Sequence, residues 1–261
     1  MRKQRKLAGW SIALVAMAAV ISAGTVYASG DTFKTEAATK VALSSEEMRD
    51  VLVNLADQPE TRFVRGPLTL KEAAANNAFG APANMEFKPR SCATYLEEVV
   101  GELGSLDGWL QYGSRVSPNR LDNFIQVVVH IPTGADEALL DRIRERVNTC
   151  RTGVLTLDGQ VSGDITYTER KGLELQGAST LAFNGRTTFD VEPGSWQYDL
   201  VRRFEMPPDA QLLVDNEIEC VSQTNYVAQG ETLILVQEAD LGLANELTEK
   251  MHSRVSAALR G

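Results

Sequence analysis

The amino-acid sequence predicts an α+β domain, an antiparallel sheet packed with helices, behind an N-terminal export segment. Three observations predict this class. Helical and strand-like patterns follow one another in a loosely segregated order. Residues 151–189 are short alternating segments punctuated by glycine, which is typical of antiparallel strands joined by tight turns. The regular strand–helix alternation of a parallel, doubly wound sheet is missing.

The first 28 residues have the layout of a secretory signal peptide. The first six hold four positive charges and no acid, Leu7–Ala23 is an apolar run, and Val26 and Ala28 stand at the small-residue positions before a cleavage site. The alternative is an uncleaved membrane anchor, because Leu7–Tyr27 matches the roughly 20 residues of a spanning helix. Either way, we expect Ser29 onward to be extracytoplasmic, either secreted or anchored to the cell membrane.

The exported part is strongly acidic. The 261-residue chain has a formal net charge of −9, and residues 1–28 contribute four basic and no acidic side chains, so the remainder carries −13. Such a surface repels nucleic-acid phosphates and anionic lipid headgroups. We therefore expect no nucleic acid as a partner, and membrane contact only through the N-terminal segment if it stays uncleaved. An unknown small molecule or an envelope protein is the expected partner.

Residues 29–43 are polar, small and without periodicity, which predicts a linker and leaves 44–261 as a single domain. Apolar residues that recur every three or four positions predict the helices Met48–Ala56, Cys92–Gly101, Gly134–Cys150 and Leu241–Leu259. Ser44 and Glu47 form a capping box before the first helix, and Ser91 is placed to cap the second. Residues 57–90 contain four prolines, so we expect a connection there with at most a short helix over Leu70–Asn76.

Strands are predicted where apolar residues alternate or run continuously. They are Gly108–Val116, Phe124–Ile131, the segments GVLTL, DITYT, LELQG and STLAFNGRTTF, and then Trp196–Met206, Gln211–Val214, Ile218–Tyr226 and Thr232–Gln237. Phe124–Ile131 is apolar at nearly every position, which predicts a central strand covered on both faces. Trp196–Met206 alternates except at Val201 and Arg202, where we expect a bend or bulge.

The sequence contains no recognisable catalytic constellation. Neither His130 nor His252 has a second His or Cys at ligand spacing, so we expect no metal site, no cofactor and no catalytic residue. The acidic pairs Glu97–Glu98 and Asp136–Glu137 are expected at exposed helix positions, and Asp215–Glu217 in a hairpin turn.

Aromatic residues in the predicted strands are expected mainly in the core, with a ligand pocket as the alternative. They are Trp109, Tyr112, Trp196, Tyr198 and Phe204.

Three cysteines follow the export segment, an odd number for an oxidising compartment. The sequence permits three single pairings. Cys92 starts one predicted helix and Cys150 ends another; a bridge between them closes a loop of about 58 residues and is worth roughly 3–4 kcal/mol in the loop-entropy model. Cys220 is then either a small buried hydrophobe or an intermolecular link.

The order of several features resembles a known family. A Leu-rich helix (EEMRDVLVNLADQP), a Cys that opens a helix (SCATYLEEVV) and a helix that ends in Cys (DEALLDRIRERVNTC) precede two terminal strands and a last helix (IECVSQTNYVAQGETLILV, ANELTEKMHSRVSAAL). Over roughly residues 45–259, this layout resembles the PknH-like extracellular domains of actinobacteria, the sensor modules of transmembrane kinases and of stand-alone exported proteins.

The resemblance implies an antiparallel sheet packed with helices around a cleft, a Cys92–Cys150 disulfide and no catalytic residues. The further disulfide that the family often has near its terminal strands is in doubt, because Cys220 has no mate here.

Together, these observations favour a non-catalytic extracytoplasmic sensor or ligand-binding domain of the cell envelope. The alternative is a structural or protein-interaction component of the envelope, joined as a disulfide-linked dimer through Cys220. An unrecognised enzyme ranks third. The sequence does not identify the residues that bind a ligand.

Overall fold

The computed structural model describes residues 40–56, 61–76, 85–93, 96–117, 120–192, 194–199 and 217–261. The predicted export segment, residues 1–28, and most of the predicted linker lie outside the described residues. Among the helices that the structure describes, none is long and apolar enough to cross a membrane.

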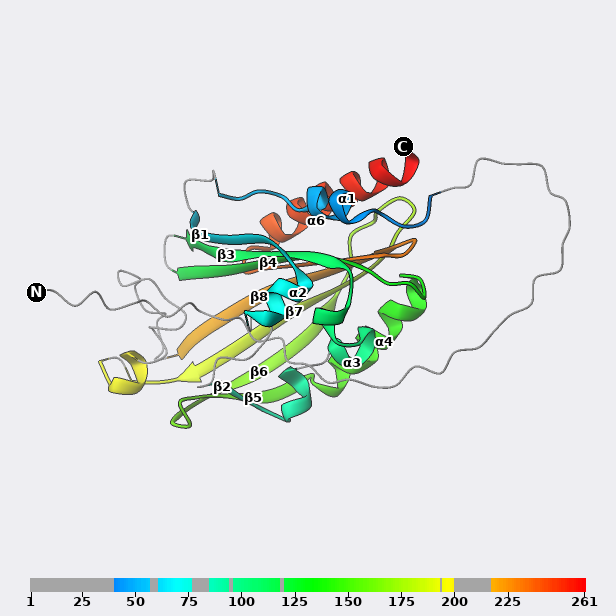
Figure 1. The fold of residues 1–261 in the computed structure, drawn as a ribbon. Helices are drawn as coiled ribbons and strands as arrows, with labels where there is room; N and C mark the ends of the chain where they lie inside the picture. The colour runs from blue at the N-terminus through cyan, green and yellow to red at the C-terminus, as the bar shows by residue number, and fades with distance from the viewer. Residues whose placement is uncertain are drawn as a thin grey trace, which may run out of the picture.

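In the described residues, nine strands form one antiparallel sheet (Figure 1). They are β1 (Thr61–Thr69), β2 (Met85–Lys88), β3 (Gly108–Ser117), β4 (Arg120–His130), β5 (Thr152–Leu157), β6 (Val161–Arg170), β7 (Ser179–Asp190), β8 (Glu217–Gln229) and β9 (Thr232–Glu238). Their order across the sheet is β1-β3-β4-β9-β8-β7-β6-β5-β2. The helices are α1 (Ser45–Val51), α2 (Leu70–Ala75), α3 (Glu97–Val100), α4 (Glu137–Thr149) and α6 (Leu241–Arg260), with the 3₁₀ turns η1 (Arg90–Ala93) and η2 (Leu103–Ser105). The predicted α+β class is confirmed.

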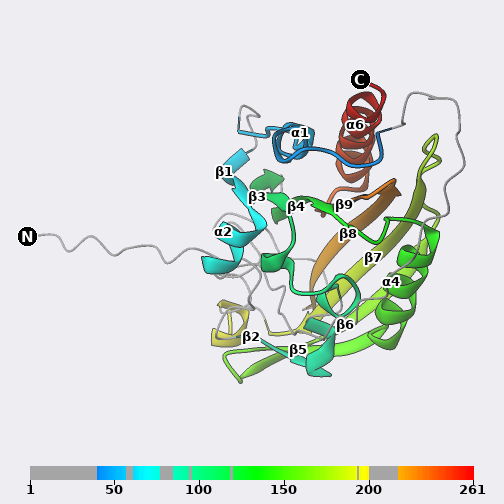
Figure 2. The same ribbon diagram turned by 45° about the vertical axis from the view of Figure 1, so that its right-hand side comes forward.

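Helices cover both faces of the sheet, and Figure 2 shows the two groups on opposite sides of it. α1 and α6 share one apolar cluster with the sheet, to which they contribute Val51, Leu247 and Met251. α2, α3 and α4 lie on the other face, where Ile143 and Val147 of α4 are buried in a second cluster. β4 lies between the two layers and is buried on both faces, as its continuous apolar run predicts.

The two longest helices begin where their caps place them. Asp136 accepts a hydrogen bond from the Leu139 amide (2.9 Å) at the start of α4, and Asp240 accepts one from the Leu243 amide (2.8 Å) at the start of α6. The apolar stripe of each helix then faces the sheet, which is the arrangement that its periodicity predicts. α1 is also capped as predicted, by the Ser44–Glu47 capping box.

Two strands occur where the sequence predicts only a connection. β1 and β2 are the two edges of the sheet. The prolines of residues 57–90 had favoured a connection over strands in the prediction. Pro67 is tolerated in β1 because an edge strand leaves half of its amides unpaired, and the ladder with β3 shifts register between Arg65 and Leu68. β2 has four residues, which is too short for an alternating pattern to be evident.

Three other predicted elements are wrong. The helix Cys92–Gly101 is instead η1 followed by the short α3, which ends at Val100 and is capped by Gly101, a glycine with a φ of 90°. The strand LELQG is a loop in which the Ala178 amide donates to the Leu175 carbonyl (3.3 Å). The segment that begins at Trp196 is helical over Trp196–Asp199 rather than extended. The remainder of that segment, together with Gln211–Val214, Asp215 and Asn216, lies outside the described residues.

A disulfide joins Cys92 in η1 to Cys150, which directly follows α4. Their Cα atoms are 5.4 Å apart, and the bridge spans 58 residues of sequence. It therefore fastens the segment before α3 to the far end of the helix that covers the sheet. Cys220 lies in β8 opposite Thr187, and its side chain is outside the description.

The last residues of the predicted linker already contact the domain. The Glu231 amide, in the turn between β8 and β9, donates to the Val41 carbonyl (3.0 Å), and Leu43 is buried in the cluster below α1 and α6. Gly230 makes this approach possible, because a Cβ at that position would lie 2.6 Å from the Val41 oxygen. The chain is thus fixed to the sheet before α1 begins.

Candidate ligand-binding groove

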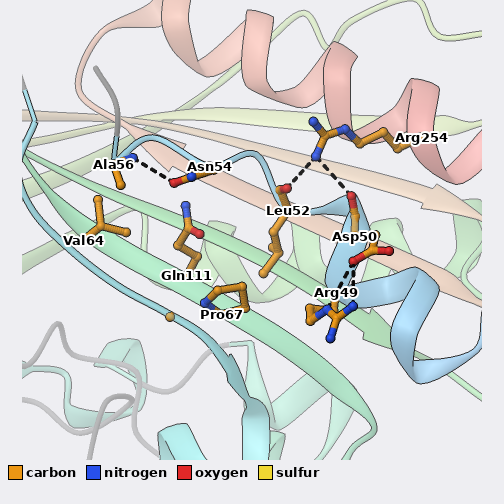
Figure 3. Close-up of a pocket in the computed structure, with 10 residues that line it drawn as sticks. Arg49, Asp50, Leu52, Asn54, Ala56, Val64, Pro67, Gln111 and Arg254 are labelled. Carbon is orange, nitrogen blue, oxygen red and sulfur yellow. Dashed lines mark hydrogen bonds and ion pairs between the residues drawn. The ribbon is translucent and has the colours of Figure 1, made fainter. Parts of the chain in front are cut away.

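An open groove of about 630 Å³ lies between the end of α1, edge strand β1 and α6 (Figure 3). It is lined by Arg49, Asp50, Leu52, Asn54, Ala56, Val64, Gly66, Pro67, Gln111 and Arg254. Five of these residues belong to the end of α1 and the segment that follows it. That segment, residues 52–56, therefore forms one wall of the groove.

Two glutamine side chains of the sheet hold this wall in place through hydrogen bonds to the backbone of Val53. The Gln126 side chain of β4 accepts a hydrogen bond from the Val53 amide (2.8 Å) and donates one to its carbonyl (3.0 Å). Gln111 of β3 donates a second hydrogen bond to the same carbonyl (2.8 Å). Gln126 is fully buried and Gln111 is 2% exposed, so these bonds are shielded from water. We call the contact of the two glutamines with Val53 the glutamine clamp.

The clamp explains why α1 stops at Val51 rather than at Ala56, as predicted from periodicity. In a continued helix the Val53 amide would donate to the carbonyl of Arg49. Here it donates to Gln126, and the Arg49 carbonyl instead accepts from the Leu52 amide (3.2 Å). Leu52 is already extended, with φ −62° and ψ 138°. A tertiary contact has thus overridden the local pattern.

Arg254 of α6 satisfies the carbonyls that this early end leaves free. Its Nη1 donates to the carbonyl oxygens of Asp50 (3.1 Å), Val51 (3.4 Å) and Leu52 (2.5 Å). A cation at the C-terminal end of a helix also opposes the negative end of the helix dipole. Figure 3 shows this guanidinium on the wall above the groove. Arg254 thus fixes the end of α1 while it lines the groove.

β1 supplies the facing wall, and it lies close to β3. Gly66 has a φ of 111°, and a Cβ at this position would lie 2.6 Å from the Leu110 carbonyl oxygen. Glycine is therefore required both by the conformation and by the close approach. The next peptide bond, Gly66–Pro67, is cis. Val64 and Pro67 give this wall its apolar surface.

The polar side chains of the lining bond to other groups of the protein. Asp50 is the one carboxylate of the described lining, and Arg49 holds it through Nε (3.2 Å) and Nη2 (3.1 Å). The Asn54 side chain accepts from the Ala56 amide (2.9 Å). The remaining polar side chains, Gln111 and Arg254, hold backbone groups. The groove thus presents cations, amides and apolar surface.

None of the predicted aromatic candidates lines the groove. Tyr112 and Tyr198 are buried in the core, which agrees with the core interpretation. Trp109 packs against the apolar cluster that α1 and α6 share with the sheet, and its Nε1 donates to Ser45 Oγ (3.1 Å). Trp196 is exposed, and Phe204 lies outside the described residues. The signal in the sequence was instead a glutamine within the apolar run FIQVVVHI, because a buried amide needs partners.

The titratable residues singled out in the sequence lie away from the groove. His130 Nε2 lies 2.8 Å from Glu231 Oε2. His252 is buried in α6, 3.2 Å from Ser256 Oγ, and burial lowers its pKa. In the described part of the chain, no group of three His, Cys, Asp or Glu side chains is arranged to hold a metal ion.

Glu97 departs from expectation, since it is buried rather than exposed. It is 2% exposed, and its Oε1 accepts from the Leu103 amide (3.3 Å). Burial raises the pKa of this carboxyl, the Leu103 hydrogen bond lowers it, and the nearby charge of Glu102 raises it. The neighbouring Glu98 forms an ion pair with Arg146 of α4.

The described residues thus form an α+β domain with one nine-stranded sheet and an open groove of about 630 Å³ beside its β1 edge. No family model matches the chain, and no curated protein matches it. The similar solved structures include the following two. The extracellular domain of PknH from Mycobacterium tuberculosis is 12% identical, with 82% of this chain and 97% of that chain covered and a TM-score of 0.46. An uncharacterized protein from Mycobacterium smegmatis, an Rv0999 ortholog, is 12% identical, with 78% and 90% covered and a TM-score of 0.36.

A PknH extracellular domain is thus among the solved structures that this chain resembles, as the resemblance of the sequence predicts. At 12% identity the likeness concerns the layout of the chain and identifies no residue of a site.

Proposed function

We propose that this chain is a non-catalytic, extracytoplasmic ligand-sensing domain of the cell envelope, and that its ligand binds in the groove between α1, β1 and α6. The observation that carries the proposal is the glutamine clamp. Two buried side chains from the sheet hold the Val53 backbone, so the groove wall exists before any ligand arrives. A preformed site avoids the entropic cost of ordering a loop on binding.

Two features support the extracytoplasmic part of the proposal. The first 28 residues have the layout of an export signal. Cys92 and Cys150 are joined by a disulfide, and such bridges persist mainly in oxidising compartments outside the cytoplasm. Whether residues 1–28 are cleaved or kept as an anchor decides between release and membrane attachment, and N-terminal sequencing of the native protein distinguishes the two.

The chemistry of the lining supports binding rather than catalysis. General acid–base work needs a titratable group free to exchange a proton with the substrate. The carboxylate of Asp50 is instead bound to Arg49, and Gln111 and Arg254 hold backbone groups. These side chains are therefore engaged within the protein rather than placed for proton transfer.

Native mass spectrometry of the full chain purified from its own host tests the proposal. We expect a retained small molecule in the wild type, its loss in Ala56→Trp, which fills the groove, and its retention in Ala257→Trp. Ala257 is an exposed residue of α6 that does not line the groove, so it provides a matched control. A molecule that Ala56→Trp retains as well as the wild type would refute the groove as the site.

A second candidate function, a protein-interaction component of the envelope, is favoured by Phe63. This side chain lies on edge strand β1, is 44% exposed and packs edge-on against Tyr112 with ring centroids 6.1 Å apart. An exposed edge strand is a surface on which another chain can pair. Analytical ultracentrifugation of the full chain, with and without reductant, tests the dimer form of this candidate and a Cys220 link. A monomer under both conditions removes both.

A further inference from the structure

One histidine of α6 is almost closed off from water. His252 is 9% exposed, and its Nε2 lies 3.2 Å from the hydroxyl oxygen of Ser256, one turn further along the helix. That hydroxyl lies within hydrogen-bond distance of both polar side-chain atoms of Gln229, Nε2 (3.1 Å) and Oε1 (3.2 Å). Gln229 is the last residue of β8. The three side chains thus connect α6 to the end of a sheet strand.

The loop between β6 and β7, residues 171–178, lies against the same place. Its Leu175 and Ala178 pack on the apolar cluster that α1 and α6 share with the sheet. Its Gly177 comes so close to β8 that a Cβ there would lie 3.9 Å from Gln229 Nε2. We call this segment the 171–178 loop. It fixes one side of the space around the buried histidine.

This environment disfavours a charge on the His252 ring. Burial lowers the pKa of His252, a hydrogen bond with the Gln176 backbone raises it, and the charge of Arg260 lowers it. The hydrogen bonds themselves do not oppose protonation, because the Ser256 hydroxyl can accept from a protonated ring and donate to Gln229. The cost of the charge is therefore chiefly the loss of water around it. That cost disappears when the ring becomes exposed.

The carboxylates of the neighbouring elements are exposed or engaged elsewhere. Glu174 pairs with Lys171 within the 171–178 loop (2.6 Å), and both side chains are 82% exposed. Glu231, in the turn after β8, lies 2.8 Å from His130. Glu249 of α6 is exposed. None of these three carboxylates is among the groups that shift the pKa of the buried ring.

We propose that His252 is an acid-sensitive latch that holds the 171–178 loop against α6. The neutral ring stays buried, and the loop stays closed. Because burial lowers its pKa, the latch is strongest above the ordinary value of 6.5 and weakens as the pH falls below it. Opening of the loop then lets water reach the charged ring. This inference goes beyond the proposed function, because it concerns another part of the fold and involves no ligand.

An NMR titration of the labelled, oxidised chain between about pH 7.5 and pH 5 tests the latch. We expect the His252 ring to titrate below 6.5, and the Gly177 and Ala178 amides to shift with the same midpoint. Hydrogen exchange of the Ala178 amide, corrected for its intrinsic pH dependence, should become at least about threefold faster at the lower pH. The Val128 amide, in the central strand, should keep its protection. Loop amides that do not follow the ring, or an equal loss at Val128, would overturn the latch.

The two histidines provide a matched pair of variants. His252→Gln keeps a polar side chain that cannot gain a proton, so exchange of the Ala178 amide should lose its response to pH. His130→Gln makes the same substitution beside Glu231 and should leave that response intact, while its single remaining ring signal assigns the titration. The wild-type titration decides the proposal even if His252→Gln fails to fold. A response that persists in His252→Gln, or that is lost in His130→Gln, would contradict the latch.

Discussion

Replacement of Gln126 by leucine is the sharpest test of the glutamine clamp. Leucine keeps most of the volume, so little cavity forms, but the Val53 amide loses its acceptor and the Val53 carbonyl loses one of two donors. A buried donor left without a partner costs about 1–3 kcal/mol. The carbonyl keeps Gln111, so its share is smaller. We expect a loss of about 2 kcal/mol in the free energy of unfolding.

Urea denaturation of the oxidised chain, followed by tryptophan fluorescence, measures this loss. Hydrogen exchange of the Val53 amide should accelerate in the same variant, because its acceptor is gone. Gln160→Leu is the control, since Gln160 is exposed in the turn between β5 and β6 and should change stability by less than about 0.5 kcal/mol. A Gln126→Leu variant as stable as this control, with an unchanged Val53 amide, would refute the reasoning.

The two glutamines should also be coupled, because both donate to one carbonyl. Gln111→Leu alone leaves that carbonyl bonded to Gln126, and we expect a loss of about 1 kcal/mol. The double variant leaves it without either donor, so its loss should exceed the sum of the single losses by about 1 kcal/mol or more. Additive losses would show that the two side chains act separately.

Three further predictions concern other parts of the fold. Burial raises the pKa of Glu97 above its ordinary value of 4.5, so the folded state binds this proton more tightly than the unfolded state. The contribution of Glu97 to the free energy of unfolding is therefore most favourable below pH 4.5 and declines as the pH rises through the raised pKa. Urea titrations from pH 4 to 7 measure this decline, and Glu97→Gln should remove it. An identical pH profile in the wild type and the variant would contradict the assignment. Gly66→Ala places a Cβ 2.6 Å from the Leu110 carbonyl oxygen at a φ of 111° and should cost about 1–3 kcal/mol, measured by thermal unfolding; a neutral result would mean that β1 moves away from β3 freely. Paired serine substitution removes the Cys92–Cys150 bridge, which spans 58 residues, and should lower the free energy of unfolding by about 3–4 kcal/mol. Equal urea midpoints with and without the bridge would contradict the loop-entropy argument.

The parts of the fold that the sequence predicted well are long and periodic. α4, α6 and β4 have many positions that repeat one pattern, and their burial follows that pattern. β1 was missed because an edge strand needs fewer amide donors and therefore tolerates Pro67. The pattern of a strand is thus clearest where the strand is most constrained, in the centre of the sheet.

The groove was not predicted, because its residues come from four separate stretches of sequence. Gln126 and Val53 are 73 positions apart, and nothing in the segment LVNLADQP indicates that its backbone will bond to side chains. Helical periodicity there predicted a longer α1, and it failed at the point where the tertiary contact takes over. Similarly, Glu97 looks like an exposed helix residue until its short helix is set against Leu103. Long-range contacts decided each of these positions.

The docking of residues 40–43 against the turn between β8 and β9 has a mechanical consequence. A pull on the chain before Lys40 acts first on the Val41–Glu231 hydrogen bond and on the buried side chain of Leu43. The chain continues from there through α1 to Val53, whose backbone is hydrogen-bonded to Gln111 and Gln126 of the sheet. Tension applied from the N-terminal side is therefore transmitted along the backbone to the groove wall, where these hydrogen bonds to Val53 resist it.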